Sequence, residues 1–108
     1  MEKNYTKSFC ARLTADLLNG GISHFVSAPG ARNAAVVRSL AENKRAKLHV
    51  HFDERGAGFF ALGISKALGE PVAVICTSGS ALANLMPAVV EAKQRRVPLV
   101  VILSLIHI

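Results

Sequence analysis

Residues 49–63 read HVHFDERGAGFFALG, a stretch in which a β-prone run passes directly into a helical pattern. The run 48–52 is predicted to form a strand, and the small-residue pattern from Glu54 onward is predicted to form a helix. Two acids, Asp53 and Glu54, therefore stand where a strand ends and a helix begins. Side chains at that position commonly reach a ligand in α/β proteins, so Glu54 is a candidate functional acid. The alternative is an acid that only favours the positive end of a helix.

The alternation of strand and helix continues on both sides of this stretch. Helical periodicity covers residues 5–18, 31–42, 54–68 and 78–95, and strand-like runs cover residues 22–28, 48–52, 72–77 and 97–103. Strands that alternate with helices of this length predict a parallel sheet with helices on both faces, a three-layer α/β fold. The runs 72–77 and 97–103 are predicted to be buried strands. Pro87 is predicted to kink or restart the last helix.

Composition limits the classes of function. The chain has 108 residues, of which 51% are hydrophobic, so it is expected to form one compact domain. It contains no apolar run long enough for a membrane span and shows no apolar signal at its start, and Cys10 and Cys76 lie far apart. These features predict buried thiols and a cytoplasmic protein. The net charge of +6 is scattered without interleaved aromatic residues, so nucleic acid is not an expected partner.

Three predicted strand ends are expected to meet at one edge of the sheet. They are residues 28–32 (APGAR), 52–55 (FDER) and 77–80 (TSGS). Ligands bind outside the carboxyl ends of parallel strands, so their convergence predicts a binding site. Arg32 favours an anionic partner there, with a solvated arginine as the alternative.

The third of these turns is open to two interpretations. Its backbone N–H groups could hold an anion at the start of the following helix. Alternatively, Thr77 or Ser78 is an ordinary N-cap of that helix.

Two further patterns favour structural roles. His49, His51 and Asp53 have a spacing that some metallohydrolases use, but no additional ligands follow at suitable positions, so the histidines are interpreted as strand residues that are structural or line a pocket. Phe59 and Phe60 stand at helical spacing beside small residues and are predicted to pack in the core.

The stretch 49–63 resembles the signature of the 2-succinyl-5-enolpyruvyl-6-hydroxy-3-cyclohexene-1-carboxylate (SEPHCHC) synthases, thiamine-diphosphate enzymes of menaquinone biosynthesis. Residues 77–92, TSGSALANLMPAVVEA, and residues 28–32 are similar to two further blocks of that family, in the same order and spacing. The FDER block is specific to the family, whereas the TSG block is shared more loosely with acetolactate synthase and its relatives. The resemblance extends over residues 5–103.

The resemblance implies a role for each strand end. Residues 1–103 would form the N-terminal, pyrimidine-binding domain, incomplete and with a truncated thiamine-diphosphate-binding fold. Glu54 would be the catalytic acid that hydrogen-bonds N1′ of the cofactor's aminopyrimidine. The cofactor would also be bound by Thr77, Ser78 and Gly79, and the substrates by Arg32 and Ala31.

The resemblance also implies the reaction and its partners. The family decarboxylates 2-oxoglutarate and adds the product to isochorismate. It binds the diphosphate through Mg²⁺ or Mn²⁺, with the ligands in a separate C-terminal domain, so no metal ligand is expected in this chain. A homodimer is implied, since the family's active site lies between subunits, and an exposed apolar surface is expected to follow.

The chain departs from the family pattern at two places. Ala28 and Ala31 replace serines, which removes hydroxyl groups from the first turn. Residues 104–108 form an atypical tail where the family continues into a Thr-Ala-Asp-Arg-Pro turn. We therefore expect a truncated reading frame whose isolated product is inactive. The alternatives are the pyrimidine-domain subunit of a split 2-oxoacid decarboxylase and a non-catalytic α/β binding module.

Overall fold

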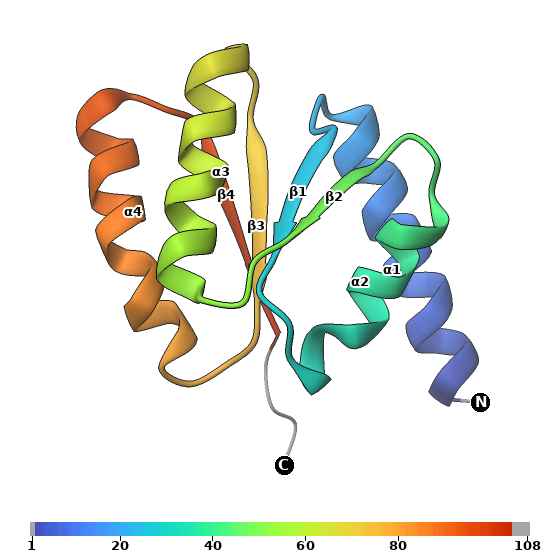
Figure 1. Ribbon diagram of the computed structural model, residues 1–108. Helices are drawn as coiled ribbons and strands as arrows, with labels where there is room; N and C mark the ends of the chain where they lie inside the picture. The colour runs from blue at the N-terminus through green and yellow to red at the C-terminus, as the bar shows by residue number, and fades with distance from the viewer. Residues whose placement is uncertain (1, 105–108) are drawn as a thin grey trace.

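The computed structural model describes residues 2–104 as a parallel sheet with helices on both faces (Figure 1). The elements are α1 (Glu2–Asn19), β1 (His24–Ser27), η1 (Ala31–Asn33), α2 (Ala34–Glu42), β2 (Lys47–Val50), α3 (Glu54–Leu68), β3 (Val72–Cys76), α4 (Ala81–Arg95) and β4 (Leu99–Leu103). This order confirms the predicted alternation of helices and strands. Of the tail, residues 105–108 lie outside the described range.

The sheet has the strand order β2-β1-β3-β4, and every neighbouring pair is parallel. In the central register, Val26 pairs with His49 on one side and with Val74 on the other. Because all strands run in one direction, their carboxyl ends lie at the same edge of the sheet, the lower edge in Figure 1. The predicted convergence of three strand ends is therefore confirmed.

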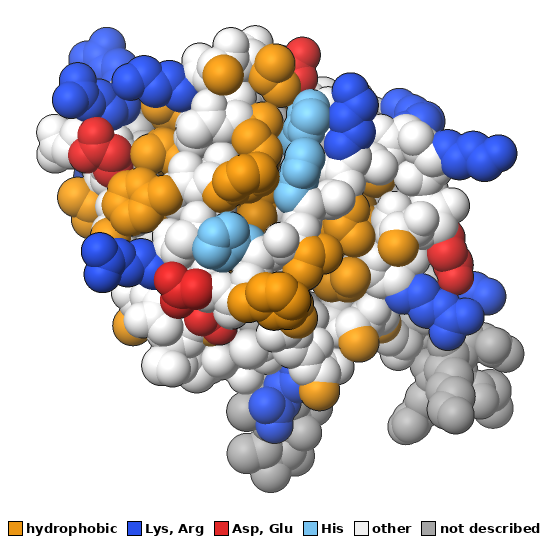
Figure 2. All heavy atoms as spheres, in the orientation of Figure 1, with side chains coloured by type: hydrophobic (Ala, Val, Ile, Leu, Met, Phe, Trp, Pro, Cys, Tyr) orange, Lys and Arg blue, Asp and Glu red, His pale blue; other side chains and the backbone are white. Residues whose placement is uncertain are grey.

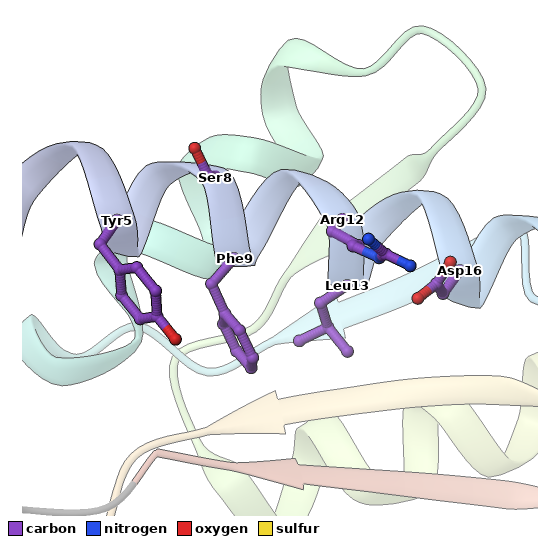
Figure 3. A pocket seen from close by; sticks show the side chains of 6 residues that line it. All are labelled: Tyr5, Ser8, Phe9, Arg12, Leu13 and Asp16. Atoms are coloured by element: carbon purple, nitrogen blue, oxygen red, sulfur yellow. The ribbon is translucent and has the colours of Figure 1, made fainter.

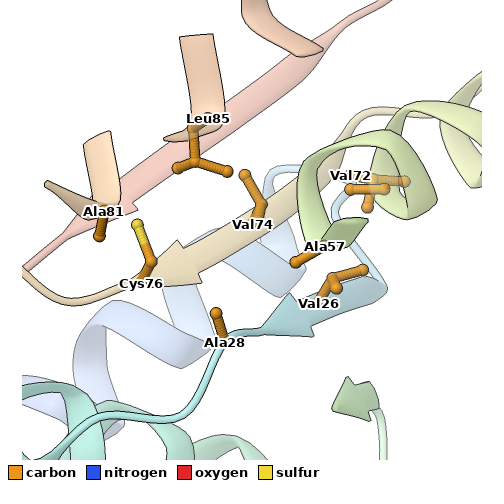
Figure 4. Close-up of a cluster of buried hydrophobic side chains, with 9 residues drawn as sticks. Val26, Ala28, Ala57, Val72, Val74, Cys76, Ala81 and Leu85 are labelled. Atoms are coloured by element: carbon orange, nitrogen blue, oxygen red, sulfur yellow. The ribbon is translucent and has the colours of Figure 1, made fainter. Parts of the chain in front are cut away.

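Two apolar layers hold the helices against the sheet. The layer under α3 and α4 contains Val26, Ala28, Ala57, Ala61, Val72, Val74, Cys76, Ala81 and Leu85 (Figure 4). The layer on the opposite face, under α1 and α2, contains Leu18, Ile22, Phe25, Leu40, Ala73 and Ile75. Apolar residues of β3 alternate between the two layers, so this strand is buried on both faces, as predicted. The three-layer architecture is confirmed as well.

The edge strands differ from the prediction. Residues 97–103 were predicted to form a buried strand, but β4 begins at Leu99 and is only half-buried along its whole length. This prediction was wrong because β4 pairs with β3 alone and its other side has no neighbouring strand in the described range. At the other edge, β2 ends at Val50, so His51 and Phe52 lie in the turn before α3.

Helix α3 begins at the predicted residue because the acid before it caps its first turn. The Asp53 carboxylate accepts a hydrogen bond from the backbone N–H of Gly56 at 3.1 Å. Gly69 ends the helix in the left-handed conformation, with φ of 69°.

The buried face of α3 is narrower than the sequence indicated. It consists of Ala57, Gly58, Ala61 and Ser65. The prediction that Phe59 and Phe60 pack in the core was wrong: their side chains are 40% and 46% exposed. Small residues bring α3 close to its neighbours, and the two rings flank this contact instead of entering it.

Helix α4 continues through its proline. The helix was predicted to kink or restart at Pro87; it does not restart, since α4 is one element from Ala81 to Arg95. Leu85 and Ala88, on either side of the proline, are fully buried. Their packing compensates for the backbone hydrogen bond that Pro87 cannot donate.

Large apolar side chains are exposed, as expected from the resemblance. They are Tyr5, Phe9, Val50, Phe52, Phe59, Phe60, Leu68, Leu82, Met86 and Val90.

A pocket of about 450 Å³ lies along α1, and the side chains of Tyr5, Phe9 and Leu13 point toward β3 and β4 (Figure 3). Both predicted thiols, Cys10 and Cys76, are buried and free. None of the helices in residues 2–104 is both long and apolar enough to cross a membrane.

Replacement by alanine is expected to have opposite effects on stability at two glycines of α3, Gly58 and Gly63. A Cβ at Gly58 would lie 2.8 Å from the Cβ of Ala88, whereas a Cβ at Gly63 would meet nothing within 4 Å. We expect Gly58→Ala to lower the free energy of unfolding by about 1–2 kcal/mol, because overpacking outweighs the gain in helix propensity. Gly63→Ala should raise it by about 0.5–1 kcal/mol. Urea unfolding followed by circular dichroism would measure both, and equal effects would contradict this packing of α3 on α4.

Candidate functional site

The candidate site lies at the carboxyl edge of the sheet, between β1 and β3. These neighbouring strands are followed by helices on opposite faces: α2 lies on one face and α4 on the other. Such a switch in direction opens a crevice at the strand ends, where α/β proteins bind ligands.

The turns that follow β1 and β3 are in direct contact. A Cβ at Gly30 would lie 3.0 Å from the Cβ of Thr77, so only glycine allows this approach without displacing a side chain. The Ala28 N–H donates to the carbonyl of Ile75 at 2.9 Å, and the buried Asn33 amide donates to the carbonyl of Ala28 at 2.9 Å. The first bond ties the first turn to β3, the second closes the first turn on itself, and the approach of Gly30 to Thr77 brings the two turns together.

Glu54 lies near this junction, at the start of the helix that follows β2. It is the first residue of α3 and is half-buried. Its negative charge acts on Cys76, the last residue of β3. Burial first, and the Glu54 carboxylate second, raise the pKa of the Cys76 thiol to about 11. Glu54 is therefore close enough to the end of β3 for its charge to affect the Cys76 thiol, although its own helix follows β2.

The junction also contains a polar group without a protein partner. The hydroxyl of Ser27, the last residue of β1, is buried and has no hydrogen-bond partner among the described residues. Buried hydroxyl groups are normally paired, so this one is available to a ligand or a water molecule. Sequence reasoning missed Ser27, since a single serine at a strand end has no distinctive pattern.

Helix α4 begins at Ala81, later than the predicted start at residue 78. The N-cap is Ser80, whose side chain makes no capping hydrogen bond. The alternative of a cap by Thr77 or Ser78 does not hold, because Gly79 adopts a left-handed conformation, with φ of 77°, and the chain turns once more before the helix. The N-cap side chain of α4 therefore makes no hydrogen bond to the first turn of the helix.

Ala31 and Arg32 lie beside this turn, in η1. Both are exposed, and within residues 5–104 the Arg32 guanidinium has no hydrogen bond or ion pair. Arg32 is thus exposed to solvent, and its binding of an anion stays a prediction.

The three side chains with metal-like spacing have separate partners. His49 stacks on His24, with Nε2 and Nδ1 3.1 Å apart, and the Asp53 carboxylate caps α3. His51 contacts the backbone of Asp53. Figure 2 shows histidines along the boundary between α3 and β2. In the described part of the chain, no three His, Cys, Asp or Glu side chains are grouped closely enough to hold a metal ion.

The fold and the arrangement of strand ends agree with a known family. Residues 10–106 match the family described as the thiamine pyrophosphate enzyme, N-terminal TPP binding domain. The chain belongs to this family. Family membership implies thiamine diphosphate as the cofactor.

Curated relatives of this TPP-enzyme domain carry the name that the sequence resemblance indicated. The chain is 56% identical over 85 residues to the SEPHCHC synthase of Histophilus somni, covering 76% of this chain and 15% of that protein. It is 48% identical over 92 residues to the synthase of Shewanella oneidensis, covering 85% of this chain and 16% of the relative. A synthase of Chloroflexus aurantiacus is 47% identical over the same length. The chain thus spans 15–16% of the length of these relatives.

A solved structure confirms the fold of the domain. Benzoylformate decarboxylase from Polynucleobacter necessarius superimposes with a TM-score of 0.77 at 24% identity, covering 88% of this chain and 18% of that one. At this identity the likeness shows only the shared architecture.

The proximity of Glu54 and Cys76 predicts a pH dependence. In a Cys10→Ala background, the Cys76 thiolate should form with a pKa of about 11, and Glu54→Gln should lower that pKa while leaving it above the ordinary 9.0. Ultraviolet absorbance of the thiolate against pH measures both. An unchanged midpoint in Glu54→Gln would contradict the placement of Glu54.

The same shift affects stability in a defined direction. The unfolded chain releases the Cys76 proton near 9.0, whereas the folded chain keeps it to about 11. The free energy of unfolding should therefore fall as pH rises through this interval. Cys76→Ala, compared by urea unfolding at each pH, should remove this part of the fall. An identical pH profile in the variant would show that burial does not perturb the thiol.

Proposed function

We propose that this chain is the pyrimidine-binding part of a SEPHCHC synthase, with residues 1–103 as the domain. The observation that carries the proposal is a half-buried Glu54 at the start of α3, near enough to affect the pKa of Cys76 at the end of β3, in a domain of the thiamine pyrophosphate family. The relatives named above, all synthases of this type, support the choice of reaction.

The residues at the junction suit the aminopyrimidine end of thiamine diphosphate. Glu54 offers a carboxyl group that can hold a proton at N1′ and take it back, and the Ser27 hydroxyl has no partner in the protein. When bound, the cofactor supplies the carbanion chemistry of the reaction. In this proposal Glu54 is the catalytic acid, and Thr77, Ser78 and Gly79 hold the cofactor through the turn before α4.

The substrates of the proposed reaction, 2-oxoglutarate and isochorismate, are both carboxylates. The exposed Arg32 guanidinium can bind a carboxylate with two parallel hydrogen bonds. Ala31 lies beside it and would line the substrate site. Alanine at positions 28 and 31 offers no hydroxyl group, so Arg32 would carry more of the substrate binding on this turn.

Other parts of the proposed enzyme lie beyond the described residues. Mg²⁺ or Mn²⁺ would bind the diphosphate through a C-terminal domain, because residues 5–104 contain no acidic cluster for a metal. A homodimer would bring that domain of one subunit to the Glu54 side of the other. Phe59 and Phe60, exposed on α3, offer an apolar surface for such a contact. We place the enzyme in the cytoplasm.

The role of Glu54 is testable in a hybrid enzyme. Residues 5–103 would replace the matching segment of the Histophilus somni synthase. Glu54→Gln should lower kcat by about 10²–10⁴, since a positioned acid or base typically contributes that much. Glu70→Gln, at the other end of α3, is the matched control and should leave kcat unchanged. Full activity of Glu54→Gln in an active hybrid would favour a non-catalytic binding module, and turnover of 2-oxoglutarate alone would favour a decarboxylase.

The role of Arg32 predicts a different kinetic change. In the same hybrid, Arg32→Lys keeps the charge but loses the paired N–H groups. We expect the KM for at least one carboxylate substrate to rise by about tenfold with little change in kcat. Arg38→Lys, on the exposed surface of α2, is the control. Unchanged KM values for both substrates would show that Arg32 is a solvated surface arginine and does not bind substrate.

A further inference from the structure

His51 joins β1, the turn before α3, and the first turn of α3. Its backbone N–H donates to the carbonyl of Ser27 at 2.9 Å, which extends the pairing of β2 with β1 beyond the end of the strand. Its ring nitrogen Nδ1 lies 3.1 Å from the carbonyl oxygen of Asp53 and 3.4 Å from the Asp53 N–H. One residue thus connects the strand that ends at the site to the turn that carries Glu54.

The imidazole ring also rests against the backbone of Gly56. A Cβ at Gly56 would overlap the Cε1 atom of His51 and would lie 2.9 Å from Nε2. The ring centroid also lies 6.3 Å from that of Phe60, one helical turn after Gly56 on the same face of α3. The ring therefore lies along the first turns of α3, and Gly56 is the residue that leaves room for it.

Glu54 lies within the segment that these contacts enclose. Asp53 is bound by the His51 ring, and two further hydrogen bonds close the turn: Gly56 N–H to the Asp53 carboxylate at 3.1 Å, and Ala57 N–H to the Asp53 carbonyl at 2.7 Å. The latter two fix the start of the helix but do not connect it to the sheet. The His51 contacts supply that connection.

We propose that His51 is a positioning residue for Glu54: its ring, which contacts Asp53 and lies against Gly56, fixes the first turn of α3 and so the place from which the Glu54 side chain projects. The kinetic part of this inference rests on the proposed function of Glu54. The structural part does not, because it concerns the first turn of α3 in the chain itself.

The structural part is tested by hydrogen exchange in the 108-residue chain. His51→Ala should accelerate exchange of the Gly56 and Ala57 amides by about three- to tenfold, the loss expected for one hydrogen bond, and leave the Val74 amide in β3 unchanged. His49→Ala is the matched control, because His49 lies on β2 near Phe60 and makes no hydrogen bond to Asp53 or Gly56 within residues 5–104. Unchanged exchange at Gly56 and Ala57 in His51→Ala would overturn the proposal.

A double-mutant cycle tests the contact between the ring and Gly56 directly. Gly56→Ala should reduce the equilibrium constant for folding by about fivefold or more in the original chain, because the new methyl group displaces the ring. In the His51→Ala background the same change should be neutral or stabilising, as expected for alanine in a helix. Additive effects of the two changes would overturn the proposal. The cycle remains informative if one variant is only marginally stable, since the coupling is read from the difference.

The kinetic part is tested in the hybrid synthase. His51→Leu should lower kcat by about 10- to 100-fold with unchanged KM for the carboxylate substrates, and should slow proton exchange at C2 of bound thiamine diphosphate to a similar degree. His51→Asn, which places an amide N–H near the position of Nδ1, should recover part of the loss. His49→Leu should leave both rates unchanged.

The outcomes separate this inference from the proposed function. If Glu54→Gln abolishes C2 proton exchange but His51→Leu leaves it unchanged, His51 does not position Glu54 and the inference fails alone. If Glu54→Gln has no effect on that exchange, the proposed function fails, and the exchange rates of Gly56 and Ala57 still decide whether His51 holds the first turn of α3.

Discussion

The parallel pairing of β1 with β3 is the interaction on which the arrangement of the site depends. The Ala28 N–H donates to the carbonyl of Ile75 one residue beyond β1, so the pairing continues into the turn. The following helices then leave on opposite faces, and Gly30 lies against Thr77. Because even a Cβ at Gly30 would press on Thr77, the two turns lie close together at the end of the sheet. A break in the pairing would separate the turns before any ligand could bridge them.

Close packing by small residues brings the acid to that surface. Gly58 lets α3 approach Ala88 of α4, and Gly56 makes room for the ring of His51. Both contacts act near the N-terminus of α3, where Glu54 stands. The residues of α3 that face the core are small, and its two large rings, Phe59 and Phe60, lie outside that face and are exposed. The buried face of α3 therefore packs closely against its neighbours, whereas Phe59 and Phe60 give the helix an exposed apolar surface.

Much of the fold could be predicted from the sequence because hydrophobic periodicity reports directly on secondary structure. The alternation of helices and strands, the burial of β3 on both faces and the start of α3 at Glu54 all follow from local pattern. The errors concern side chains whose environment depends on distant neighbours. Burial of residues 97–103 depended on a second neighbouring strand, and the continuity of α4 through Pro87 depended on packing against α3. No local pattern contains that information.

The candidate site divides in the same way. By itself, the sequence determined that Glu54, Arg32 and the turn 77–79 lie at strand ends, since parallel strands share one edge, and its motifs indicated the family. Only the tertiary structure decided that the Glu54 charge affects Cys76 at the end of β3, that the Ser27 hydroxyl has no partner among the described residues, and that His51 lies against Gly56. The physical reason is that strand order and side-chain packing are set by contacts between residues far apart in the chain. A sequence pattern can indicate which residues belong to a site, but the packing of helices against the sheet decides which of them come into contact.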